Sequence, residues 1–128
     1  MAGPAKIFTI LNGWTMSTYV QMAEFLKALA HPARLQIADI LREREACVCH
    51  LEAYLGYRQP YISQQIMVMR KAGLLAERRK GTYVFYRLAD PRVGALLDTL
   101  LPAGSAKKGR RVRACSCPDC APVAETVA

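Results

Sequence analysis

The spacing of the apolar residues changes from helical to strand-like after four helical segments, and this change constrains the fold more than any other feature of the sequence. Four successive segments have apolar side chains at helical spacing: residues 17–30, 32–44, 48–55 and 59–72. Two short strands and a final helix are predicted after them: residues 75–79, 82–88 and 91–101. The two strands meet at a tight turn, Lys80-Gly81. This order predicts a mainly α fold with a β-hairpin, and such an arrangement is a winged helix-turn-helix.

Proline and glycine set the predicted helix boundaries. Pro32 and Pro60 stand in the first turn of a helix, where the missing N–H costs nothing. Gly56 and Gly73 end the third and fourth helices.

The length and composition indicate one globular domain. The chain has 128 residues, 52% of them hydrophobic, which suffices for one modest core. We divide it into an N-terminal arm at 1–14, a winged-helix domain at 15–102 and a flexible, basic, cysteine-rich tail at 103–128. Charged residues interrupt every apolar stretch before the roughly 18 residues that span a bilayer, and no secretory signal is recognisable. We therefore expect a soluble, cytoplasmic protein.

The charge of the chain favours a polyanionic partner. The formal net charge is +8, and nucleic acid is the commonest partner of such a protein. Residues 104–128 hold five basic and two acidic side chains, a local +3, so +5 belongs to the rest of the chain.

The fourth predicted helix suits the major groove of DNA. Its beginning carries amide and hydroxyl side chains that can pair with base edges, and the basic hairpin turn can lie against phosphates. We predict a dimer on double-stranded operator DNA, with one reading helix in each half-site. The predicted DNA-binding residues are Arg58, Gln59, Tyr61, Ser63, Gln64, Gln65, Arg70, Arg78, Arg79 and Lys80.

The five cysteines form two tight clusters, which is not the pattern of a secreted disulfide framework. Cys47 and Cys49 open the third helix, where unpaired N–H groups favour a thiolate. Residues two apart on an ideal helix point about 200° away from each other. Both sulfurs therefore reach one ion only if Cys47 lies outside the helix or the first turn is distorted.

Three stretches resemble the ArsR/SmtB family of metal-responsive repressors, in the same order and spacing. "FLKALAHPARLQIADIL" is similar to the family's opening helices, "LGYRQPYISQQIMVMRKAGLL" to its helix-turn-helix and "RRKGTYVFYRL" to its wing. Together they cover about residues 25–88. One departure is Gln64-Gln65, where the family often has histidine, and this leaves the base preference open.

The "CVC" of residues 47–49 resembles the arsenic, cadmium and lead sensors of that family, whose members release DNA when the ion binds. His50 follows where an acidic residue is usual; it either adds a nitrogen ligand or faces water, and we favour water. The resemblance implies a thiophilic inducer, and As(III) or Sb(III), which favour three sulfurs, come first. Cd(II), Pb(II) and Zn(II) are the alternatives. The predicted metal ligands are Cys47, Cys49, Cys115, Cys117 and Cys120.

Other hypotheses stay open beside this one. The repressor could sense oxidation through a disulfide, or it could be a metal-blind winged helix used for protein contacts. A thiol oxidoreductase using Cys117 and Cys120 is disfavoured, because such a pair should begin a helix in a βαβ unit, and we expect no enzyme. We do not expect the family's other metal site, since the final helix offers Asp90 and Asp98 but no histidine. His31 is interpreted as a structural residue between two helices.

The predicted mechanism links the two sites. The ion-free dimer occupies the operator, and the ion bound at Cys47 and Cys49 favours a dimer shape that fits DNA poorly. A coupling of roughly 1–3 kcal/mol is typical of such linkage. The first and last helices are expected to form the dimer contact, because their apolar residues exceed what this domain can bury alone.

Overall fold

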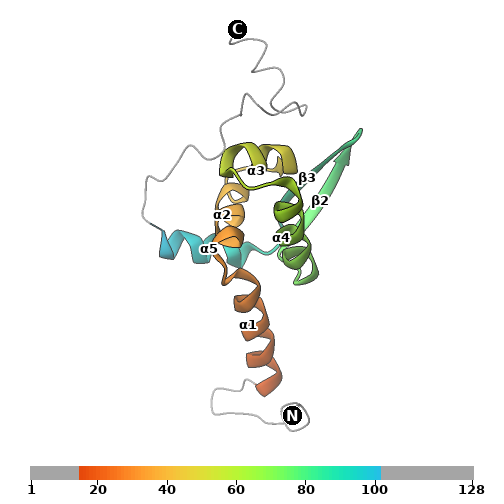
Figure 1. Ribbon diagram of the computed structural model, residues 1–128. Helices are drawn as coiled ribbons and strands as arrows, with labels where there is room; N and C mark the ends of the chain where they lie inside the picture. Colours follow the sequence, from red (N-terminus) through yellow and green to blue (C-terminus); the bar gives the residue numbers. More distant parts are fainter. Residues whose placement is uncertain (1–14, 102–128) are drawn as a thin grey trace.

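The computed structural model describes residues 15–101, which form five helices and a three-stranded antiparallel sheet (Figure 1). The order is α1 Met16–Leu29, α2 Pro32–Leu41, β1 Ala46–Cys47, α3 Val48–Leu55, α4 Gln59–Lys71, β2 Leu75–Lys80, β3 Tyr83–Leu88 and α5 Pro91–Leu100. The winged helix-turn-helix prediction is confirmed. The N-terminal arm and the cysteine-rich tail of the predicted division lie outside the described residues. Within residues 15–101, no helix combines the length and the apolar character needed to cross a bilayer.

Local capping explains where the helices begin and end. His31 caps α2, with its Nδ1 accepting the N–H of Ala33 at 3.1 Å, so the structural interpretation of this histidine is confirmed. At the end of α3, Gly56 has a φ of 82°, the left-handed conformation that glycine adopts without steric cost.

The sheet has the order β1-β3-β2, so the hairpin strand β3 lies in the middle. Its register with β2 runs from Leu75 opposite Leu88 to Lys80 opposite Tyr83. The two-residue strand β1, which sequence reasoning missed, pairs Cys47 with Phe85. The first cysteine is therefore held by the wing strand itself.

The buried apolar side chains form two clusters, a large one among the helices and the base of the wing and a small one of Phe85 and Cys47. The fully buried large side chains come from α2, α3, α4, β3, α5 and the turn after α4: Ile37, Ile40, Leu51, Ile62, Met69, Leu74, Phe85 and Val93. The apolar residues at helical spacing that predicted the fourth helix are the ones that α4 buries in the large cluster: Ile62, Ile66 and Met69. The polar side of α4 is thereby turned outward.

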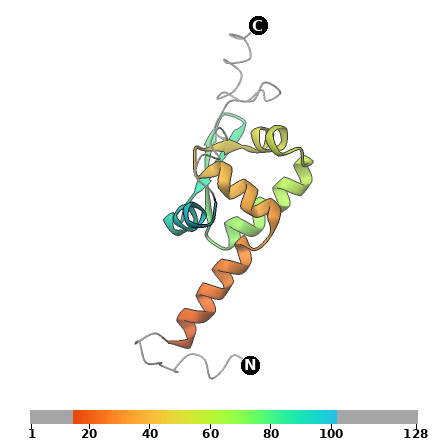
Figure 2. The same cartoon turned by 90° about the vertical axis from the view of Figure 1, so that its left-hand side faces the viewer.

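Helix α1 projects from the rest of the domain in two perpendicular views (Figures 1 and 2). Only Ala28 and Leu29, near its end, are buried. Three large apolar residues nearer the start of α1 are each close to half exposed: Val20, Met22 and Leu26. On α5, Leu100 is 66% exposed.

The start of α5 depends on one carboxylate. Asp90 accepts the backbone N–H of Arg92 at 3.0 Å and pairs with its guanidinium at 2.7 Å. The hydrogen bond from the Arg92 side chain holds the pKa of Asp90 below its ordinary value. The same guanidinium lies 4.5 Å from the centre of the Phe25 ring, which ties α5 to α1.

We expect Asp90→Ala to lower the free energy of unfolding by about 0.5–2 kcal/mol near neutral pH, because the helix cap is lost. A carboxyl whose folded pKa is depressed stabilises the protein above its unfolded pKa, and this contribution disappears as the pH falls through the folded pKa. The difference between variant and wild type should therefore shrink in acid. Urea unfolding at several pH values measures it, and a difference independent of pH would contradict this role.

Candidate nucleic-acid interface and thiol pair

The outward side of α4 carries most of the predicted base-reading residues. Arg58, Gln59, Ser63 and Gln64 are exposed, while Tyr61 is half-buried. The ring of Tyr61 packs at 5.1 Å against that of Tyr57, which fixes its direction. These side chains share the first turns of one helix, next to the turn that follows α3.

Gln65 has a different environment from the other predicted reading residues. It is only 8% exposed, and its Oε1 accepts a hydrogen bond from Arg34 of α2 at 3.0 Å. This contact joins α2 to α4 below the outward surface. We therefore leave Gln65 out of the proposed DNA-contacting set and assign it to the support of α4.

The basic residues of the wing fall into two groups. Arg78 is held by Glu45, 2.7 Å away, and its guanidinium lies 4.9 Å from the centre of the Phe85 ring. Arg79 and Lys80 are exposed at the end of the hairpin, where Figure 1 shows β2 and β3 extending away from the helices. Arg70 pairs with Glu77 at 3.3 Å, so this arginine braces α4 against β2.

The two thiols of the CVC sequence lie side by side. Cys47 is the residue that caps α3, with extended backbone angles (φ −89°, ψ 170°), and its sulfur accepts the N–H of His50 at 3.4 Å. Because Cys47 lies outside the helix, the two Sγ atoms are 2.8 Å apart. This separation exceeds the roughly 2.05 Å of a disulfide bond, yet it allows one atom to bond both sulfurs. Of the two arrangements left open by sequence analysis, the structure adopts the first.

A surface cavity of about 290 Å³ adjoins the thiol pair. Cys47, Val48 and Cys49 form one side, and Gln59 of α4 forms another. The remaining lining comes from the wing: Thr82, Tyr83, Val84 and Tyr86. Burial raises the pKa of the Tyr86 hydroxyl, and the charge of Glu77 adds to this rise. The cavity is therefore lined by the thiol pair, the start of α4 and the wing.

The orientation favoured for His50 was wrong. The sequence interpretation placed this side chain in water, but only 2% of its surface is exposed. Its ring stacks on that of Tyr54 with 6.1 Å between centroids. Position 50 lies on the inner side of α3, next to the buried Leu51.

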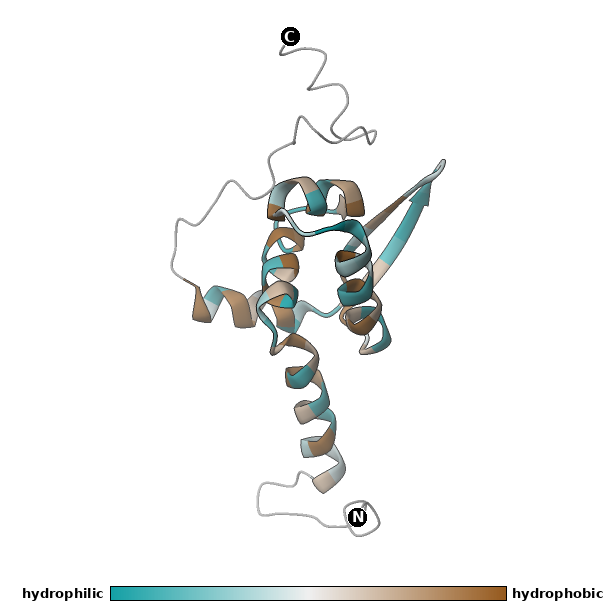
Figure 3. Cartoon of the chain, viewed as in Figure 1, coloured by the Kyte–Doolittle hydropathy of each residue, from teal (hydrophilic) through white to brown (hydrophobic). Residues whose placement is uncertain are grey.

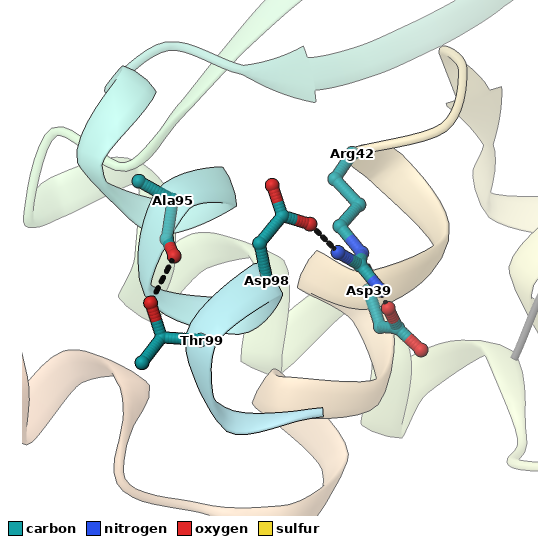
Figure 4. Close-up of polar contacts among 5 residues, drawn as sticks. All are labelled: Asp39, Arg42, Ala95, Asp98 and Thr99. Carbon is teal, nitrogen blue, oxygen red and sulfur yellow. Dashed lines mark hydrogen bonds and ion pairs between the residues drawn. The ribbon is translucent and has the colours of Figure 1, made fainter. Parts of the chain in front are cut away.

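The acids of the final helix serve structural contacts. Asp90 caps α5, and Asp98 pairs with Arg42, the residue that follows α2, which also pairs with Asp39 at 2.7 Å (Figure 4). Within residues 15–101, no group of three or more histidine, cysteine or acidic side chains could hold a metal ion. The described part of the chain thus offers a thiophilic ion two sulfurs, and the predicted ligands Cys115, Cys117 and Cys120 lie outside it.

Comparison with known proteins agrees with this arrangement. Residues 31–77 match the model of the family described as "Bacterial regulatory protein, arsR family". The biofilm growth-associated repressor of Agrobacterium fabrum is 46% identical over 80 residues, covering 62% of this chain and 68% of that protein.

Two solved structures have the same fold. The transcriptional repressor BigR from Xylella fastidiosa superposes with a TM-score of 0.64 at 35% identity, over 71% of this chain and 93% of that one. A homodimeric winged helix-turn-helix DNA-binding domain from Mycobacterium bovis superposes with a TM-score of 0.60 at 32% identity, over 66% of this chain and 78% of that one. With its helix-turn-helix, wing and sequence all shared with these regulators, the chain belongs to the arsR family and is a transcriptional repressor, not an enzyme.

Proposed function

We propose that this repressor binds operator DNA as a homodimer and is released by a thiophilic metalloid ion, As(III) or Sb(III). The observation that carries the proposal is the 2.8 Å separation of the Cys47 and Cys49 sulfurs beside the reading helix and the wing. Soft thiolate ligands select ions of this kind. The third sulfur that As(III) favours comes from the tail, whose candidates are Cys115, Cys117 and Cys120.

The structure offers a short path from the thiols to both DNA-contacting elements. Cys47 pairs with Phe85 in the sheet, and β3 continues from Phe85 to the tip of the wing. Gln59, the first residue of α4, lines the same cavity as the two sulfurs. An ion that draws Cys47 and Cys49 into its own geometry therefore acts on the wing and on the start of the reading helix together.

The proposed DNA contacts separate into two kinds. Gln59, Ser63 and Gln64 are exposed on α4 and read base edges in the major groove. Arg79 and Lys80, at the wing tip, contact phosphates. Arg70 and Arg78 form closer ion pairs with acids, at 3.3 Å and 2.7 Å, than Arg79 does with Glu77, at 4.0 Å, and they position the elements that carry the others.

The uncovered apolar surface of α1 and α5 supports dimerisation. Brown, hydrophobic segments follow α1 along its projecting length in Figure 3. Val20, Met22 and Leu26 are close to half exposed in the single chain, and Leu100 is 66% exposed. Exposed apolar side chains gathered on two elements favour a partner subunit, and one structural relative is a homodimer. The expected dimer contact through the first and last helices is therefore kept as part of the proposal.

The two kinds of contact predict two kinds of mutant. Lys80→Ala should weaken binding to all duplexes alike and reduce the slope of log affinity against log salt by about 1. Gln64→Ala should instead reduce discrimination at one base pair by about 1–3 kcal/mol, with the salt slope unchanged. Fluorescence anisotropy with an in vitro selected operator and its single-base variants measures both. The same effect from the two variants would contradict this division.

An inducer screen tests the proposed function. The full-length protein is bound to its selected operator and titrated with As(III), Sb(III), Cd(II), Pb(II) and Zn(II) under reducing conditions. We expect release with As(III) and Sb(III) at the lowest concentrations. Release by Cd(II) or Pb(II) alone would overturn the assignment of the inducer, and retention with every ion would overturn metal sensing.

The same sulfur separation favours one alternative, a repressor that senses oxidation. A peroxide would convert one thiol to a sulfenic acid, and attack by the second thiol would give a disulfide and water. Hydrogen peroxide added to the operator complex without metal discriminates the two. Release that a thiol reductant reverses, with no release by any ion, would favour this alternative.

A further inference from the structure

A surface groove of about 650 Å³ lies between α1 and the end of α4, and it shares no lining residue with the cavity at the thiol pair. Its volume is within the roughly 300–1,000 Å³ that is typical of binding pockets. The apolar lining comes from Val20, Phe25 and Ala28 of α1 and from Val68 and Ala72 at the end of α4. Val20 is 48% exposed and Val68 is 41% exposed, so both walls are open to an apolar occupant.

The groove lies on a different side of α1 from most of the apolar surface proposed for the dimer contact. Glu24 lines the groove, and Met22 and Leu26 are each two residues away from it. Residues two apart on a helix point about 200° away from each other, so Met22 and Leu26 face away from the groove. Of the three exposed apolar residues of α1, Val20 is the one that borders it. A second copy on the Met22 side therefore leaves the groove open.

We propose that the groove is occupied by residues 7–11 of the same chain. These residues read Ile-Phe-Thr-Ile-Leu, so four of the five are large and apolar and none is charged. Asn12-Gly13 follows them, and this dipeptide is typical of tight reversals of the chain. A reversal there sends residues 7–11 back along α1.

The lengths of the two segments agree with this placement. Val20 and Ala28 lie about 6 and 18 Å along α1 from Met16, because a helix rises 1.5 Å per residue. Residues 7–11 precede Thr15, the cap of α1, by four to eight residues, which an extended chain spans in about 13–29 Å. Docked in this way, they cover Val20 and Val68 together. The segment then joins the helix proposed for the dimer contact to the helix proposed to read DNA.

The test places a single indole in the docked segment. Trp14 is the only tryptophan of the chain, so the full-length chain with Trp14→Phe and Phe8→Trp reports on residues 7–11 alone. We expect an emission maximum at a shorter wavelength than that of the same chain in urea, and weak quenching by acrylamide. An indole that is as exposed in the folded chain as in urea would overturn the proposal.

Val68→Glu in this background should move the emission maximum and the quenching constant towards their values in urea, because a carboxylate is costly to bury under an apolar segment. Met67→Glu is the matched control. Met67 is the neighbouring residue on α4, is 53% exposed and does not line the groove, so this variant should keep the indole protected. If Val68→Glu unfolds at a lower urea concentration than the control, Val20→Lys on the opposite wall takes its place. Equal shifts from the groove variant and the control would contradict docking in the groove.

A mixing experiment separates docking within one chain from docking into a partner subunit. The reporter chain is refolded from urea with an excess of a chain that has no tryptophan and carries Trp14→Phe with Val68→Glu. Most reporter chains that dimerise then have a partner with an altered groove. Docking within one chain predicts that the emission of the reporter is the same with and without the second chain. Exposure of the indole in the mixture would place the segment in the partner's groove and overturn the proposal.

Discussion

Cys47→Ser and Cys49→Ser should each abolish the release of operator DNA by As(III). Both sulfurs must bond the ion for its geometry to act on the wing and on α4, since a single thiolate holds arsenic without joining β1 to α3. A typical coupling changes DNA affinity by about 5- to 150-fold, and each variant should reduce that factor to nearly one. Anisotropy titrations of the operator complex with and without arsenite measure it.

Neither substitution should unfold the protein, so the loss of release would not come from lower stability. Serine is among the best residues for capping a helix, so Cys47→Ser keeps an acceptor for the N–H of His50. Cys49 is half-buried at the edge of the cavity, where a hydroxyl is readily solvated. Thermal unfolding and DNA affinity without ion should therefore stay close to wild type for both variants. Retention of full arsenite release by either one would mean that the inducer binds elsewhere.

Phe85→Ala should lower the free energy of unfolding by about 3–5 kcal/mol. The ring is fully buried, packs with Cys47 and lies under the guanidinium of Arg78. This loss is a large part of the roughly 5–15 kcal/mol that stabilises a domain. Urea unfolding with a linear extrapolation measures it.

Tyr83→Ala is the matched control, because Tyr83 lies on the same strand but is only half-buried. It should cost clearly less than Phe85→Ala. Equal losses would indicate that the base of the wing is not a packed unit. In that case the path from Cys47 through β3 to the wing tip would lose its physical basis.

Most of the fold could be predicted because its elements are locally encoded. The helical spacing of apolar residues located all five helices to within a few residues, and the third helix, 48–55, has the predicted bounds. Strand β1 could not be predicted in this way. It is only two residues long and exists because Cys47 meets Phe85, a contact between distant parts of the chain that leaves no periodic signal.

The residue types of the candidate site could be predicted from the sequence, but the directions in which its side chains point could be predicted less well. The CVC spacing marked the thiols, but whether they converge depends on the backbone angles of one residue, Cys47, at the start of α3. His50 turns inward beside Leu51, on the side of α3 that packs against the rest of the domain. Gln65 faces Arg34 rather than the outside because helix packing, not residue type, determines which glutamine is exposed.

The central claim is that ion binding at the thiol pair and DNA binding at α4 and the wing oppose each other. Linkage requires that the factor by which arsenite weakens operator affinity equals the factor by which operator DNA weakens arsenite affinity. Isothermal titration of arsenite into the free protein and into its operator complex, beside the DNA titrations, gives both factors. We predict two equal factors of about tenfold or more in wild type and factors of one in the Cys47→Ser, Cys49→Ser double variant. An arsenite affinity that is the same with and without DNA would contradict the account.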